Sequence, residues 1–96
     1  MSKQELAIAK KIAEIEGVKS PTFRMPFDEY IGRHYNPFDW SILGPLMVKH
    51  EIEVDYVDSS AYIRSNESAY KCWALFSCKE EVPRAILECI IKSQEV

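Results

Sequence analysis

The chain has 96 residues, of which 47% are hydrophobic, and a formal net charge of −3. This length suits one domain with a single core, and the hydrophobic content indicates a folded chain rather than a disordered one. The small negative charge and the lack of a long basic run argue against nucleic acid as a partner. We therefore expect one domain, residues 1–96, that binds no nucleic acid.

The sequence also argues against a membrane location. No stretch reaches the roughly 20 apolar residues that a spanning helix needs, and the first residues read as an amphipathic helix rather than a signal peptide. We expect a cytoplasmic protein with no membrane partner. The spacing of Cys72, Cys78 and Cys89 fits no zinc site, so reduced and largely buried structural cysteines are predicted.

The amino-terminal part of the chain predicts a helix followed by a long connection. Ser2 and Glu5 have the spacing of a capping box, and isoleucines recur at helical intervals behind them. This pattern predicts a helix over residues 3–16, which Gly17 ends. Residues 18–35 contain prolines and a glycine without a clear period, so a long loop is expected there.

The stretch 33–40, RHYNPFDW, predicts the start of a second helix. Asn36 is a favoured N-cap residue, and Pro37 suits the first helical position. Tyr35 and Trp40 would then form the hydrophobic staple that often accompanies such a cap. Pro45 is expected to kink this helix, because it removes one backbone hydrogen bond.

The second half of the chain predicts a small sheet and a final helix. Alternating apolar and polar residues indicate strands, and the short turns between them require antiparallel neighbours. The third strand is apolar on both faces, so we expect it to be covered on both sides. The predicted strands are 51–56, 61–65 and 69–77, and an apolar stripe over 82–91 predicts the last helix. The fold class is therefore α+β, a three-stranded antiparallel sheet layered with helices in the order α-α-β-β-β-α.

Several of these segments resemble the phage ABA sandwich domain family. The segments that carry the resemblance are 36–40 (NPFDW), 46–49 (LMVK), 70–76 (YKCWALF) and 82–89 (VPRAILEC). The resemblance implies an ABA-type sandwich, with the sheet between helices, and a phage or prophage accessory protein in the bacterial cytoplasm. It implies no established activity, so no functional residue is carried over from it.

The most plausible binding residues gather around the predicted second helix. They are Arg24, Arg33, His34, Tyr35 and Trp40. Aromatic rings could stack a planar ligand here, while arginines and the helix start hold a phosphate or carboxylate. The alternative, which we favour, is that the aromatic residues only staple a helix cap and the charged residues decorate a surface loop.

Other chemistry has weaker support in the sequence. His34 and His50 lie on different predicted elements without further fixed ligands, which argues against a metal site. Glu51, Glu53 and Asp55 form a row on one strand face, and such a row is usually solvated. No phosphate loop, catalytic triad or cofactor motif occurs, so an enzyme ranks third among the function classes.

Two hypotheses rank above an enzyme. In the first, the protein is noncatalytic and binds a host bacterial protein through exposed aromatic residues and the acidic strand face. The aromatic residues considered for that surface are Tyr30, Tyr35, Phe38 and Trp40. In the second, it binds a small nucleotide-like ligand through Arg33, Tyr35 and Trp40. A homodimer is also expected, because so small a sheet leaves open edges.

Overall fold

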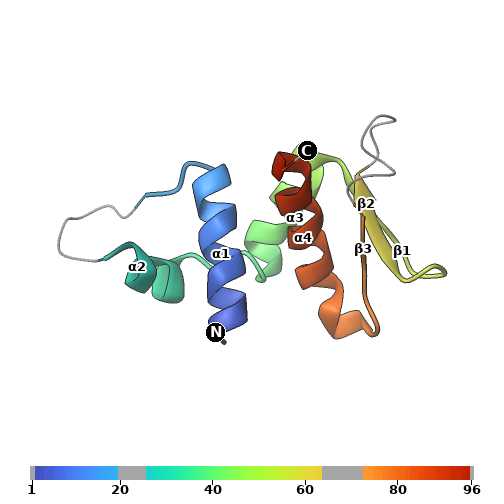
Figure 1. Cartoon of the computed structure of the whole chain (residues 1–96), viewed down its shortest axis with the longest axis horizontal. Helices are drawn as coiled ribbons and strands as arrows, with labels where there is room; N and C mark the ends of the chain where they lie inside the picture. Colours follow the sequence, from blue (N-terminus) through green and yellow to red (C-terminus); the bar gives the residue numbers. More distant parts are fainter. Residues whose placement is uncertain (1, 20–25, 64–72, 96) are drawn as a thin grey trace.

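The structure is a computed structural model that describes residues 2–19, 26–63 and 73–95. Its described part contains four α-helices and a three-stranded antiparallel sheet (Figure 1). In chain order the elements are α1 (Lys3–Ile15), α2 (Phe27–His34), α3 (Trp40–His50), β1 (Ile52–Asp55), β2 (Ser60–Ile63), β3 (Trp73–Leu75), the 3-10 helix η1 (Lys79–Glu81) and α4 (Val82–Glu95). The predicted α+β fold class is confirmed, although three helices rather than two precede the strands.

The sheet has the strand order β1-β2-β3, so β2 is central and β3 is an edge strand. In the register, Val54 lies opposite Ala61, and Ala61 lies opposite Ala74. These residues belong to an inner face, which joins the main hydrophobic core. Because side chains alternate along a strand, the intervening positions form the opposite, outer face. We define the outer face by Glu53, Asp55, Ser60, Tyr62, Trp73 and Leu75.

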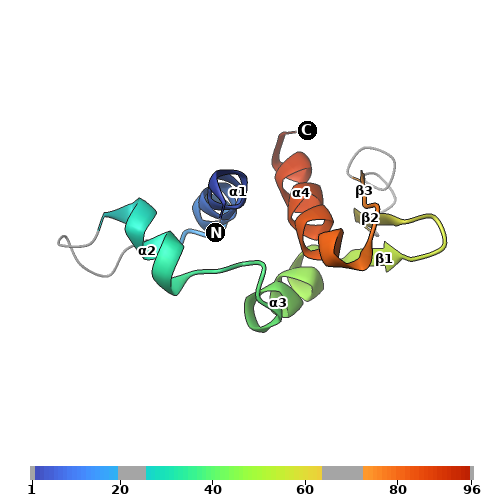
Figure 2. The ribbon, with the colours of Figure 1, turned by 90° about the horizontal axis from the view of Figure 1, so that it is seen from below.

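Helix α4 is the central element of the molecule. It packs on α1, on α3 and on all three strands, and it lies between α1 and the sheet in both views (Figures 1 and 2). Helix α2 lies at the end of the molecule that is distant from the sheet. The resulting shape is elongated, with extents of 45 × 26 × 20 Å. No helix in the described ranges has the length and apolar character needed to cross a membrane.

Buried side chains form two separate clusters. The larger includes Ile12 of α1, Leu43 of α3 and Ile86 of α4, and it continues onto the inner face of the sheet. The smaller consists of Ala9, Ala13 and Ile31, and it joins α2 to α1. The sheet and α4 therefore share one core, whereas α2 docks on α1 through another.

Helix α1 begins and ends as the sequence predicts. The Glu5 backbone N–H donates to the Ser2 hydroxyl oxygen at 3.1 Å, and the Ser2 backbone N–H donates to the Glu5 carboxylate at 3.2 Å. At the other end, Gly17 has a φ of 71°, which a residue with a Cβ atom rarely adopts. The Val18 N–H then reaches the Ala13 carbonyl at 2.8 Å, as in a Schellman motif.

The predicted loop over residues 18–35 is wrong for its second part, which forms α2. Phe27, Tyr30 and Ile31 have helical spacing, and they pack in or against the smaller cluster. An eight-residue helix is marginal in isolation, so docking on α1 has to stabilise it.

The start of the next helix also differs from the prediction. Helix α3 begins at Trp40, and its N-cap is Asp39, whose carboxylate accepts a hydrogen bond from the Ser41 N–H at 2.9 Å. Asn36 instead accepts from the Phe38 N–H at 3.1 Å and shapes the turn before the helix. Asp39 and Asn36 are both good capping residues, and the turn between them decides which one is used. The helix then continues through Pro45 without interruption.

The cysteine prediction is confirmed for one position only. Cys89 is buried in α4, where its thiol donates a hydrogen bond to the Ala61 carbonyl oxygen at 2.9 Å. Cys78 is exposed at the start of η1. Cys72 lies outside the described residues.

Candidate functional site

The described residues of the predicted binding site contact other residues rather than one another. Arg24 lies outside the described residues. Arg33 is exposed at the end of α2 and pairs with Glu29 at 3.2 Å, one helical turn away. The His34 ring lies 5.6 Å from the Tyr30 ring, measured between centroids, on the same helix. Both residues therefore make contacts within α2.

Tyr35 and Trp40 lie on either side of the turn that leads into α3. Tyr35 is half-buried and packs against both core clusters. Trp40 keeps 56% of its surface exposed, so it does not act as the predicted staple. The corrected cap places Phe38 and Leu43 at the two staple positions; Leu43 belongs to the larger cluster and Phe38 packs against it.

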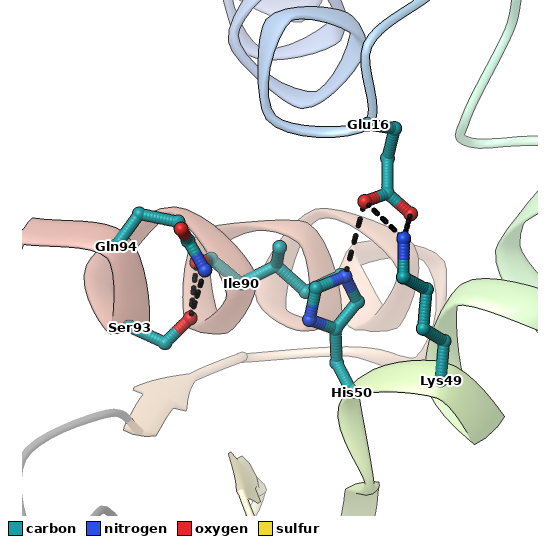
Figure 3. Close-up of polar contacts among 6 residues, drawn as sticks. All are labelled: Glu16, Lys49, His50, Ile90, Ser93 and Gln94. Carbon is teal, nitrogen blue, oxygen red and sulfur yellow. Dashed lines mark hydrogen bonds and ion pairs between the residues drawn. The ribbon is translucent and has the colours of Figure 1, made fainter.

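A polar cluster that the sequence analysis missed joins the ends of α1 and α3 (Figure 3). The Glu16 carboxylate accepts hydrogen bonds from Lys49 Nζ at 2.9 and 3.1 Å. His50 Nε2 lies 3.5 Å from the same carboxylate. These residues are 33 or 34 positions apart along the chain, so no local pattern reveals the cluster.

Tyr35 lies near this cluster, and the cluster affects the pKa of its hydroxyl. Burial raises the pKa of Tyr35, and the negative charge of Glu16 raises it further. Glu16, Lys49 and His50 provide an ionic clasp between the ends of α1 and α3.

We expect Glu16→Gln to lower the free energy of unfolding by about 1–2 kcal/mol. This range lies between the small value of an exposed ion pair and the larger loss when a buried pair is broken, because Glu16 is mostly buried and Lys49 is mostly exposed. Urea unfolding measures the change, with Glu14→Gln on the exposed side of α1 as the matched control. Equal stability of the two variants would contradict the clasp.

The outer face of the sheet presents exposed apolar side chains. Trp73 is 46% exposed and Leu75 is 58% exposed, so the prediction that the third strand is covered on both sides is wrong for these residues. Tyr62 lies opposite Trp73 in the register, and its hydroxyl donates to the Glu53 carboxylate at 2.8 Å. The outer face is thus acidic along β1 and apolar along β3.

Of the predicted row of carboxylates, Glu53 and Asp55 lie on β1 and are engaged within the chain, whereas Glu51 is the C-cap residue of α3. The Asp55 carboxylate accepts from the Val57 and Asp58 backbone N–H groups at 2.9 and 3.2 Å, and so shapes the turn after β1. Glu53 accepts the bond from Tyr62. Over the ranges that the structure describes, no three histidine, cysteine or acidic side chains cluster in a way that could hold a metal ion.

A surface groove lies where α3 meets β1. It has a volume of about 390 Å³ and is lined by Gly44, Met47, Val48, Glu51, Ile52 and Glu53. Val48 is 81% exposed there. A smaller cavity of about 200 Å³ lies between α1 and α4. Of the residues predicted as a binding site, none that the structure describes lines either cavity.

Sequence reasoning missed Trp73, Leu75 and Val48 as surface residues for a common reason. An apolar residue in a strand or helix is normally assigned to the core, and the sequence does not state how many faces its element buries. Trp73 and Leu75 are exposed because the helices pack on the inner face of the sheet, and only the assembled chain reveals which face is covered.

Comparisons of the chain with models of protein families, with curated proteins and with solved structures found no match. The resemblance to the phage ABA sandwich domain family therefore stays a prediction.

Proposed function

We propose that this protein is a noncatalytic binding protein that holds a partner protein on the outer face of its sheet. The observation that carries the proposal is the exposure of Trp73 and Leu75 on that face. Tryptophan is enriched at the centres of protein interfaces, where it buries a large area at a low cost in conformational entropy.

The charge of the outer face indicates the kind of surface that fits it. Glu53 lies in the same cross-strand row as Trp73, and Asp55 lies in the same row as Leu75. A partner surface with an apolar area beside basic side chains would complement both parts. We therefore propose a partner whose contact surface is apolar and basic.

The resemblance to phage ABA sandwich domain proteins supports a more specific form of this proposal. In that form the chain is a phage or prophage accessory protein in the bacterial cytoplasm, and its partner is a host protein. The small size of the domain and the open edges of its sheet agree with a binding role.

We expect Trp73→Ala to weaken binding of the partner at least about tenfold, as truncation of an interface hot spot does. The partner is first captured from bacterial lysate, identified by mass spectrometry, and then titrated in purified form. Trp40→Ala is the matched control, because Trp40 is also half exposed but lies on α3.

The two tryptophan variants also separate the candidate sites. Unchanged affinity of Trp73→Ala would contradict the proposed function. Loss of binding in Trp40→Ala alone would instead support the site predicted around RHYNPFDW. Circular dichroism and thermal unfolding of each variant show whether the fold is retained.

A further inference from the structure

The groove between α3 and β1 lies beside an open edge of the sheet. Strand β1 pairs with β2 on one side, and its other edge has no partner strand in the described part of the chain. Backbone N–H and C=O groups along such an edge can pair with an added strand. Met47, Val48 and Ile52 give the neighbouring groove an apolar wall.

The groove also carries negative charge. Glu51 and Glu53 line it, and none of the described residues that line it is basic. Lys49 and His50, which come just before Glu51, are not among the described residues that line the groove, and both point to Glu16 at the end of α1 (Figure 3). A cationic side chain on an incoming strand would therefore meet uncompensated carboxylate charge at Glu51.

A second copy of the chain is a poor occupant of this edge. Antiparallel pairing of β1 with itself would set the carboxylates of Glu53 and Asp55 against the same residues on the other copy. Like charges opposite one another across a strand pair are destabilising. Charge complementarity instead favours a strand with basic residues.

We propose that an extended segment of a partner protein, with alternating apolar and basic residues, adds to the free edge of β1 and places an apolar side chain in the α3–β1 groove. Backbone hydrogen bonds provide affinity in this mode of recognition, and the groove provides side-chain specificity. The groove lies at the β1 edge, whereas Trp73 and Leu75 lie on the opposite edge strand, and Glu53 borders both surfaces. It is a second binding site, and because Val48 and Trp73 lie on different elements, variants at these two residues test it separately from the proposed function.

The test uses a short fluorescein-labelled peptide of alternating lysine and valine, titrated with the full chain and followed by fluorescence anisotropy. We expect saturable binding that weakens at least about tenfold in Val48→Lys, which fills the groove and offsets part of its negative charge. Val57→Lys is the matched control, because Val57 is 93% exposed in the turn at the far end of β1. Val57→Lys and Trp73→Ala are both expected to bind as the wild type does.

A second variant isolates the role of charge. Glu51 has a φ of 56°, and asparagine tolerates this backbone conformation, so Glu51→Asn removes the charge without adding strain. We expect it to weaken peptide binding about threefold at low salt, and this difference to shrink as the salt concentration rises. A peptide of alternating glutamate and valine is expected not to bind.

Three results would overturn the inference. The first is no saturable binding of the lysine–valine peptide to a folded wild-type chain. The second is equal binding of a peptide whose backbone nitrogens are methylated, because strand addition needs their hydrogen bonds. The third is a dimer, seen by light scattering, that Val48→Lys converts to a monomer, since the occupant would then be a second copy.

Discussion

Replacing Ile86 with alanine is expected to lower the free energy of unfolding by about 2–5 kcal/mol, the range for removing a large buried aliphatic side chain. Ile86 is fully buried on α4 and belongs to the larger core cluster. Because α4 packs on α1, α3 and every strand, the cavity would loosen contacts on both sides of this helix. The loss is a large share of the about 5–15 kcal/mol by which native domains are stable.

Urea denaturation followed by circular dichroism measures this change. We expect a lower midpoint with an unchanged slope, because the surface exposed on unfolding stays the same. Val57→Ala, at a highly exposed valine, is expected to change stability by less than about 0.5 kcal/mol. A loss below about 1 kcal/mol for Ile86→Ala would show that α4 is not central to the fold.

Replacing Ile31 with aspartate is expected to detach α2 and leave the rest of the molecule folded. The substitution puts an unpaired charge into the small cluster with Ala9 and Ala13, which disfavours docking by at least about 2 kcal/mol. Helix α2 packs mainly on α1, so its loss does not open the core between α4 and the sheet. An undocked segment of this length would not stay helical.

Amide hydrogen exchange distinguishes this local event from global unfolding. We expect the α2 amides to lose protection while those of α4 keep theirs. The matched variant Ile31→Val keeps the site apolar and is expected to cost about 0.5–1.5 kcal/mol without detaching α2. Parallel loss of protection in α2 and α4 would contradict the division into two clusters.

The two clusters also bear on function. Both proposed binding surfaces lie on the sheet and at the end of α3, whereas α2 docks at the far end of the elongated molecule (Figure 2). Partner binding through Trp73 and peptide binding beside Val48 should therefore survive the loss of α2. The predicted site around Arg33 and His34 would not survive it, because both residues belong to α2.

The sequence by itself determined the features that depend on neighbouring residues. The capping box at Ser2 and the helix end at Gly17 are confirmed in place, and β1 forms at Ile52–Asp55 within the predicted strand 51–56. So are the apolar stripe of α4 and the antiparallel order of the strands. Hydrogen-bonded caps, helical or strand periodicity and short turns all act within a few residues, so one chain segment contains the whole signal.

Only the tertiary structure decided the features that depend on what an element packs against. Helix α2 is stable because it packs on Ala9 and Ala13 of α1. Its helical period is hard to recognise in the sequence, because prolines flank it and a glycine lies within it. Glu16 meets Lys49 because two helix ends converge in space. Trp73 and Leu75 are exposed because β3 lies at an edge and the helices pack on the other face. Burial is a property of the assembled chain, so the surfaces that carry the proposed function could not be read from the order of its residues.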